Sequence, residues 1–208
     1  FHLRADLGYS IEQQAVRLLD PIERAATVHD YRDLRARALW MRGHFTEQSS
    51  YAESSTAYDS AFDHFARIND QEGLAAIRTR RAGVLRGFGA GEVAWREVFY
   101  AARNGSHLID LKHQQALLLE AAAVAVSLGH PRAALLYQTT AIKKLQNALR
   151  SVSPDEIHRF RQIQLTLAIT LRHRAGTEVR LGHIDRAIDD LNESIRLVNH
   201  DKNPDLEA

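Results

Sequence analysis

Apolar residues recur along most of the chain at the three- and four-residue spacings of an amphipathic helix. We therefore expect an all-α protein without β-strands. Pro21 falls inside the first helical pattern, where proline removes a backbone donor and clashes with the preceding turn, so a kink or break is expected there. With the turn residues that separate the apolar runs, the pattern predicts helices at residues 11–28, 31–48, 51–68, 71–87, 91–104, 110–128, 131–147, 154–181 and 184–198.

The helix predicted at 154–181 has the clearest start signal. Ser153 provides a hydroxyl cap, Pro154 suits the first helical position, and Glu156 lies three residues beyond the cap. This capping box predicts that the helix begins at Pro154. No further proline occurs before Leu181, so this helix should also be the longest in the chain.

Several columns of residues repeat every 40 positions. Small residues recur at Ala61, Ala101 and Ala141, and Gly89 matches Gly129. The last repeat is displaced, because Gly182 follows Gly129 by 53 positions. A period of this length that holds two helices predicts a helical solenoid, in which small residues allow close backbone approach, so the three alanines should be buried. We expect one domain over 1–208, with a leading helix or partial repeat at 1–30 and repeats at roughly 31–70, 71–110, 111–150 and 154–200.

The local pattern in the two C-terminal repeats resembles the tetratricopeptide repeat. Over roughly residues 31–198 this resemblance implies a right-handed superhelix of antiparallel helix pairs that binds proteins or peptides. Arg42, Arg78 and Arg81 depart from the pattern, since the family has small or apolar residues at those places. The residues that carry the resemblance are Ala121-Ala122, Leu128-Gly129, Ala134, Tyr137 and Ala141, which return as Ala175, Leu181-Gly182, Ala187, Leu191 and Ser194.

The long period, with Trp95-Arg96-Glu97 in one second helix and residues 134–138 in the next, looks like the repeat arrays that precede CHAT domains, the caspase-like proteases of bacteria. The sequence contains no cysteine, so the cysteine nucleophile of such a protease is not in this chain. The resemblance implies that the chain is the recognition or regulatory arm of a larger bacterial protein.

Composition narrows the classes of partner. There are 27 basic and 26 acidic side chains, for a net charge of +1, whereas nucleic-acid-binding domains carry a clearly basic footprint. The longest nearly apolar stretch, residues 116–128, contains Glu120 and is shorter than the ~20 residues of a membrane helix. The chain opens at Phe1 without a basic and then apolar leader. We expect a cytoplasmic protein segment that binds neither nucleic acid nor membrane.

Candidate catalytic motifs have simpler interpretations. The glycine-rich segment 87–91 lacks the preceding strand and following lysine of a phosphate loop, so an inter-helix turn is expected. Ser106, His107 and Asp110 are nearly contiguous, whereas a hydrolytic triad is assembled from separate segments. None of the eleven histidines has the spacing of a metal site. We predict no enzyme activity, no metal and no cofactor; a hydrolase with an unrecognised site is the weakest alternative.

Function is instead expected on the first helix of each repeat, which lines the concave side of a right-handed array. Equivalent positions there form columns of mixed aromatic, charged and small residues, which suit a peptide or a partner helix. Ordinary helix packing is an equally good interpretation of the Leu and Ala members. The columns are Trp40, Arg80, Glu120 and His173; Leu39, Thr79, Leu119 and Arg172; and Ala36, Ala76, Ala116 and Ile169.

The basic members define the partner that we expect. Arg80, Arg86 and Arg172 favour an acidic segment, and Trp40 or Leu119 would receive an apolar anchor beside it. The leading prediction is a non-catalytic protein-binding scaffold, and the alternative is a sensor domain that closes around a signal peptide. The predicted partner-binding residues are Trp40, Leu39, Arg80, Arg86, Leu119, Glu120 and Arg172.

Overall fold

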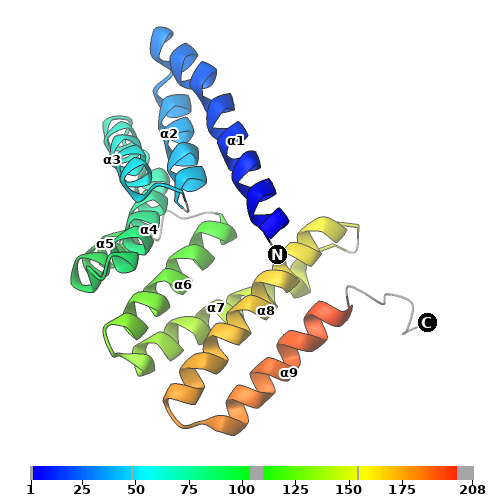
Figure 1. Cartoon of the computed structure of the whole chain (residues 1–208). Helices are drawn as coiled ribbons and strands as arrows, with labels where there is room; N and C mark the ends of the chain where they lie inside the picture. Colours follow the sequence, from blue (N-terminus) through cyan, green and yellow to red (C-terminus); the bar gives the residue numbers. More distant parts are fainter. Residues whose placement is uncertain (1, 48, 104–109, 154, 201–208) are drawn as a thin grey trace. The chain divides into compact units, whose positions relative to one another are not determined.

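The structure is a computed structural model that describes residues 2–47, 49–103, 110–153 and 155–200 (Figure 1). Within these ranges it is all-helical and contains no strand, as the sequence predicts. None of the described helices is long and apolar enough to span a membrane. The helices are α1 (His2–Val28), α2 (Arg32–Thr46), α3 (Tyr51–Arg67), α4 (Gln71–Gly87), α5 (Gly91–Arg103), α6 (Leu111–Ser127), α7 (Pro131–Ser151), α8 (Ile157–Arg180) and α9 (Ile184–His200).

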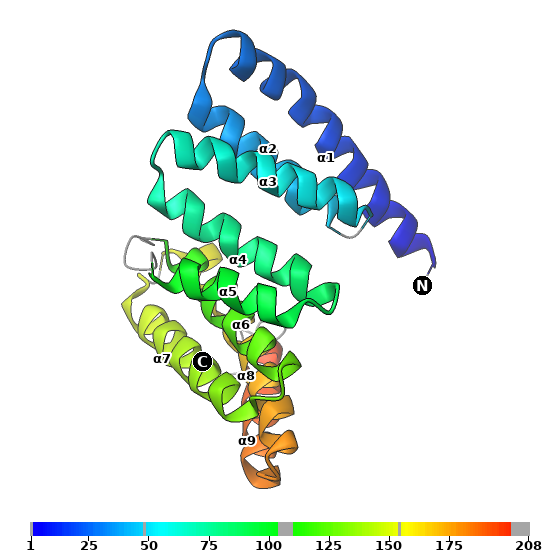
Figure 2. The same cartoon turned by 90° about the vertical axis from the view of Figure 1, so that its left-hand side faces the viewer.

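The chain divides into two compact units, unit 1 (Phe1–Leu117) and unit 2 (Leu118–Ala208). In unit 1 each helix from α1 to α4 packs against the next one along the chain (Figure 2). The core of this unit lies between α2, α3 and α4 and contains Tyr58 and Phe65, both fully buried. Glycines on the neighbouring helices make room for these rings. A Cβ added to Gly73 of α4 would lie 2.4 Å from Cδ1 of Phe65, and one added to Gly43 of α2 would lie 2.6 Å from Cδ1 of Tyr58.

The arginines that depart from the repeat pattern lie in unit 1 and tie its helices together. Arg42 of α2 donates to Glu23 and Asp20 of α1, with N–O distances of 2.8 and 2.6 Å. Arg78 of α4 donates to Glu97 of α5 at 3.0 Å, and its guanidinium lies 4.8 Å from the centre of the Phe62 ring. Ion pairing and cation–π contacts thus let charged side chains occupy positions where the family has small or apolar ones.

In unit 2, α8 packs against both α7 and α9. Its core joins Leu145 of α7, Leu167 and Leu171 of α8, and Leu197 of α9. The Ser194 hydroxyl of α9 donates to the Ala168 carbonyl of α8 at 2.9 Å. This hydrogen bond lies in a buried contact and fixes the register of the α8–α9 hairpin.

Three turns between paired helices have the same geometry. Gly89, Gly129 and Gly182 have φ values of 78°, 78° and 79°, a left-handed conformation that glycine adopts without strain. In each turn the amide after the glycine donates back across the helix end, at 2.8–2.9 Å, which is the Schellman motif. The predicted equivalence of the three glycines, including the 53-residue step, therefore holds in the structure. The turns before α2 and α4 depart from the 40-residue period by one residue. The residue in the left-handed conformation is Asp30 before α2 and Asn69 before α4, which are 39 positions apart.

The predicted alanine column is confirmed, because Ala61, Ala101 and Ala141 are each 0 % exposed. The segment Gly87 to Gly91 is the turn between α4 and α5, as expected. Of the three residues that were considered as a hydrolytic triad, Ser106 and His107 lie outside the described residues.

Two predictions, one about a helix start and one about helix length, are wrong. Helix α8 begins at Ile157 rather than Pro154, because the Ser153 hydroxyl bonds the Asp155 carboxylate and does not cap the helix. The longest described helix is α1, which runs through Pro21 without a break. Pro21 and the residue one turn before it are exposed, so the carbonyl that loses its donor can meet water.

Candidate functional site

The α8–α9 hairpin carries an open groove in unit 2. A cavity of about 420 Å³ lies between the two helices and is lined mainly by apolar atoms. Figure 1 shows the two helices side by side, and they form one of the most extensive helix contacts in the structure. The lining residues are Ile169, Arg172, His173, Ala175, Gly176 and Val179 of α8 and Leu191 of α9.

Large apolar side chains continue along both walls of the groove. On α9 they recur at spacings of four and three residues, so they form one stripe along the helix. Each is between 41 % and 57 % exposed, although isolated apolar residues are common on protein surfaces and only their alignment is informative. We call the two walls together the open face: Leu165, Ile169, Arg172, Gly176 and Val179 of α8 with Ile184, Ile188, Leu191, Ile195 and Val198 of α9.

A second stripe on α9 explains why the open face is not used to hold the hairpin together. Ala187, Asp190, Ser194 and Leu197 are buried on the adjoining side of the same helix. Asp190 accepts two hydrogen bonds from Arg174 of α8, at 2.6 and 2.7 Å, and these bonds raise the pKa of the Arg174 guanidinium. The intramolecular contact is therefore complete without the open face.

Arg172 is the charged member of the open face. Its side chain is exposed, and no ion pair with it occurs among the residues that the structure describes. None of the other nine residues of the open face is acidic. A guanidinium keeps its charge at any working pH and binds a carboxylate through two parallel hydrogen bonds. The groove thus offers an apolar surface with one site for a negative group.

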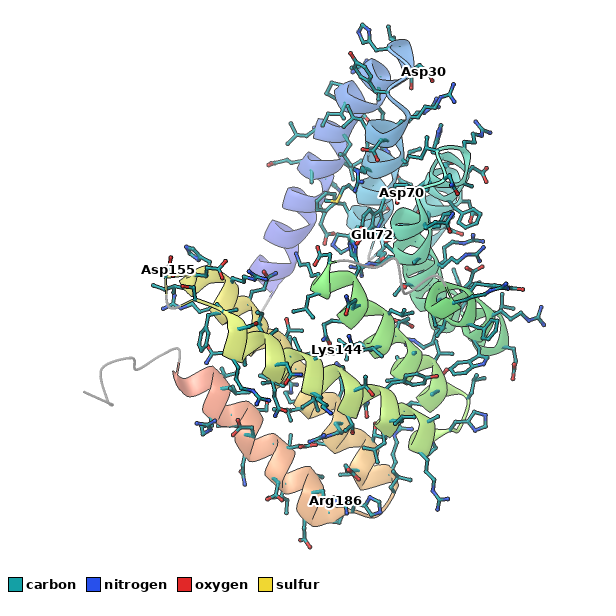
Figure 3. All side chains as sticks on the ribbon, turned by 180° about the vertical axis from the view of Figure 1, so that it is seen from behind. Asp30, Asp70, Glu72, Lys144, Asp155 and Arg186 are labelled. Atoms are coloured by element: carbon teal, nitrogen blue, oxygen red, sulfur yellow. The ribbon has the colours of Figure 1, made fainter. Side chains whose placement is uncertain are left out.

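A second cavity, of about 340 Å³, is lined by charged side chains of α8 and α9 and by Leu135 and Thr139 of α7. Three of its charged residues pair within the protein: Arg174 binds Asp190, and an oxygen of Glu178 lies 2.6 Å from the His183 Nδ1. Figure 3 marks Arg186, which also lines this cavity, in the first turn of α9. The Arg174–Asp190 and His183–Glu178 pairs stabilise the α8–α9 hairpin. Among the described residues no group of three or more His, Asp or Glu is placed to hold a metal ion.

Three residues of the predicted binding columns line the α8–α9 groove. Ile169, Arg172 and His173 are the fourth-repeat members of the three predicted columns, and all three line the α8–α9 cavity. The α9 wall is not among the predicted residues, because function was expected on the first helix of each pair. The signal was present in the spacing of Ile184, Ile188, Leu191, Ile195 and Val198.

The predicted site residues of unit 1 are more enclosed. Leu39 and Trp40 of α2 are partly buried against the core, and the Trp40 ring lies 6.4 Å from Phe65 and 5.3 Å from His113, centre to centre. Arg80 is half-buried on α4. Its charge acts on Tyr58, whose pKa is raised mainly by burial and by the hydrogen bond to Glu47, while Arg80 opposes the rise.

The remaining predicted residues are also half-buried. Arg86 lies in the last turn of α4 in unit 1, and Leu119 and Glu120 lie on α6 in unit 2. Arg86 and Glu120 both interact with neighbouring groups in the structure. Of the seven predicted partner-binding residues, Arg172 is the most accessible.

Comparison with known proteins bears on the fold. No protein-family model matches the sequence, and curated proteins gave no significant match. The chain is similar to the crystal structure of BtubC (BKLC) from P. vanneervenii, with a TM-score of 0.53 and 11 % sequence identity over 95 % of this chain and 92 % of that chain. At this identity the similarity shows a shared all-helical, repeat-like fold and carries no statement about function.

Proposed function

We propose that the chain is a non-catalytic, tetratricopeptide-like repeat module that binds another protein, and that the open face of the α8–α9 hairpin is its contact surface. The observation that carries the proposal is the α8–α9 cavity, in which large exposed apolar side chains surround Arg172. Contiguous apolar surface of this kind, with one charged group to orient a ligand, is typical of protein-binding sites.

The repeat pattern supports this assignment. In the described part of the chain four helix pairs follow a leading helix, three of the turns within pairs share one geometry, and the small-residue column is buried. The right-handed superhelix that we propose would place α2, α4, α6 and α8 on its inner side. Ion pairs of Arg42, Arg78 and Arg174 join neighbouring helices, which suits a scaffold.

The partner that we propose is a protein segment with an acidic residue beside an apolar anchor. The carboxylate would bind Arg172, and the anchor would enter the groove beside Ile169 and Leu191. Leu119 and Glu120 remain proposed contact residues of unit 2, and Trp40, Leu39, Arg80 and Arg86 remain proposed contact residues of unit 1. By the resemblance to the arrays that precede CHAT domains, this module would be the recognition or regulatory arm of a larger bacterial protein.

The test is selection of peptides from a random library displayed on phage. The wild-type chain is compared with Ile169→Glu/Arg172→Glu, which changes two exposed residues of the groove. Leu136→Glu is the matched control, because Leu136 is 67 % exposed on α7 and lies outside the open face. We expect acidic-apolar peptides that bind the wild type and the control but not the groove variant. Recovery of no groove-dependent peptide would contradict the proposal.

A further inference from the structure

The α9 stripe has a counterpart in the preceding repeat. Gly129 and Gly182 occupy the same position in turns of the same geometry, so the 53-residue step relates α7 to α9. By this step Leu191, Ile195 and Val198 correspond to Gln138, Ile142 and Leu145 of α7.

In α7 these positions are covered by the next helix. Gln138, Ile142 and Leu145 are 4 %, 4 % and 1 % exposed. Ile142 and Leu145 belong to the core cluster that includes Ile163 and Leu167 of α8. The Gln138 amide nitrogen lies 3.3 Å from the carbonyl oxygen of His173, also on α8. The stripe on α7 is thus the surface on which helix α8 packs.

Unit 1 shows the same relation independently. Two 40-residue steps before Leu145 lies Phe65 of α3, which is 0 % exposed. The helix that covers it is α4, and Gly73 of α4 brings the two backbones close at this ring. In both units the stripe of a second helix is covered by the first helix of the following pair.

On α9 no described helix covers the equivalent stripe. Leu191, Ile195 and Val198 are 42 %, 57 % and 41 % exposed, against at most 4 % for their counterparts. The groove beside the stripe contains Gly176 of α8, where an added Cβ would meet nothing within 4 Å, so a second backbone has room to approach. The open face therefore has the spacing, the apolar surface and the room that a packed helix requires.

We infer that the open face binds an amphipathic α-helix of a partner protein, packed on α9 as α8 packs on α7, with a carboxylate of that helix bound to Arg172. This inference deepens the proposed function and rests on it. The partner helix carries apolar residues at spacings of three and four, because its side chains must fit between Ile188, Leu191 and Ile195 of α9.

Charge selects a partner helix over a second copy of this chain. No carboxylate of the described residues pairs with Arg172, and the open face contains no acidic residue. Two copies that joined by this face would bring two arginines and no negative charge to the interface. An acidic helix from another protein supplies the missing charge and gains a bidentate hydrogen bond.

The inference is tested with synthetic peptides of about 18 residues, roughly 27 Å as a helix. One peptide has leucines in a heptad stripe with a central glutamate, a second has lysine in place of that glutamate, and a third has the composition of the first with the stripe scrambled. Affinity is measured by fluorescence anisotropy, and induced helix by circular dichroism. We expect the glutamate peptide to become helical and to bind about tenfold more tightly than the lysine peptide, a preference that Arg172→Ala removes.

Variants of the α9 wall complete the test. Ile188→Glu and Ile195→Glu change residues that are 50 % and 57 % exposed, so the fold should persist, and each should abolish binding of the glutamate peptide. The Leu136→Glu control should bind it normally. Equal binding of the scrambled peptide would overturn the inference. So would a dimer in light scattering that Ile195→Glu dissociates, since a second copy would then occupy the face.

The phage selection separates this inference from the proposed function. Groove-dependent peptides whose apolar residues recur at three and four positions support both. Groove-dependent peptides that are extended or rich in proline overturn the helix and leave the binding function intact. The absence of any groove-dependent peptide overturns both.

Discussion

We expect a partner helix to pack on α9 in the way that α4 packs on α3. The packing of α4 on α3 can be tested at Gly73. A Cβ at this position would lie 2.4 and 2.5 Å from Cδ1 and Cε1 of Phe65, whose ring is fully buried in the core. Overpacking of a core costs roughly 1–3 kcal/mol. Alanine favours a helix over glycine by up to about 1 kcal/mol. The clash dominates, so Gly73→Ala should lower the free energy of unfolding by about 1–2 kcal/mol.

The same substitution at Gly176 is the matched control. Gly176 is also inside a helix, but a Cβ there meets nothing within 4 Å, so Gly176→Ala should stabilise by roughly 0.5–1 kcal/mol. Urea unfolding is followed by far-ultraviolet circular dichroism for both variants. Tryptophan fluorescence reports on the unit of Gly73 alone, since Trp40 and Trp95 both lie in unit 1.

A double-mutant cycle identifies the clash as the cause. Phe65→Leu removes the ring that Gly73→Ala would meet, so the double variant should lose less stability than the sum of the two single variants, by about 0.5 kcal/mol or more. Strict additivity, or equal effects of alanine at Gly73 and Gly176, would refute the packing of α4 on α3 described above.

Three further outcomes follow from burial and charge. Ala141→Leu should cost roughly 1–3 kcal/mol in urea unfolding, because Ala141 is 0 % exposed; an unchanged midpoint would contradict its packing role. Asp190→Ala should cost about 3 kcal/mol by leaving Arg174 without its partner, and Arg174→Met/Asp190→Leu should recover most of that loss. Burial, and next Arg35, lower the pKa of His64, so the folded state binds fewer protons than the unfolded state below about pH 6.5 and loses stability as the pH falls. Thermal scans of His64→Gln should therefore show a smaller loss between neutral and acidic pH than the wild type.

The helical architecture could be predicted from the sequence because local signals and the repeat agree. Gly89, Gly129 and Gly182 follow the apolar runs, and the structure uses each in the same left-handed turn. The start of α8 could not be predicted. Ser153, Pro154 and Glu156 match a capping box, but the Ser153 hydroxyl bonds Asp155 in the structure, a local competition that the motif does not encode.

The candidate site could be predicted only in part. The column positions of Ile169 and Arg172 identified one wall of the groove. In unit 1 the corresponding Trp40 and Leu39 are partly buried against the core, and sequence equivalence cannot show which repeat has its surface covered. The α9 wall required knowledge of burial, because Ile195 and Ile142 are the same residue type at equivalent positions and differ only in whether a helix lies over them.

Hydrogen exchange with mass spectrometry tests the central claim most directly. The chain is labelled alone and with a saturating amount of the phage-selected peptide that binds it most tightly. We expect the peptide to slow exchange in the segments 165–179 of α8 and 184–198 of α9, and Ile188→Glu to remove that protection. Protection confined to α2 and α4, or protection of α8 and α9 that persists in Ile188→Glu, would contradict the assignment of the open face as the binding surface.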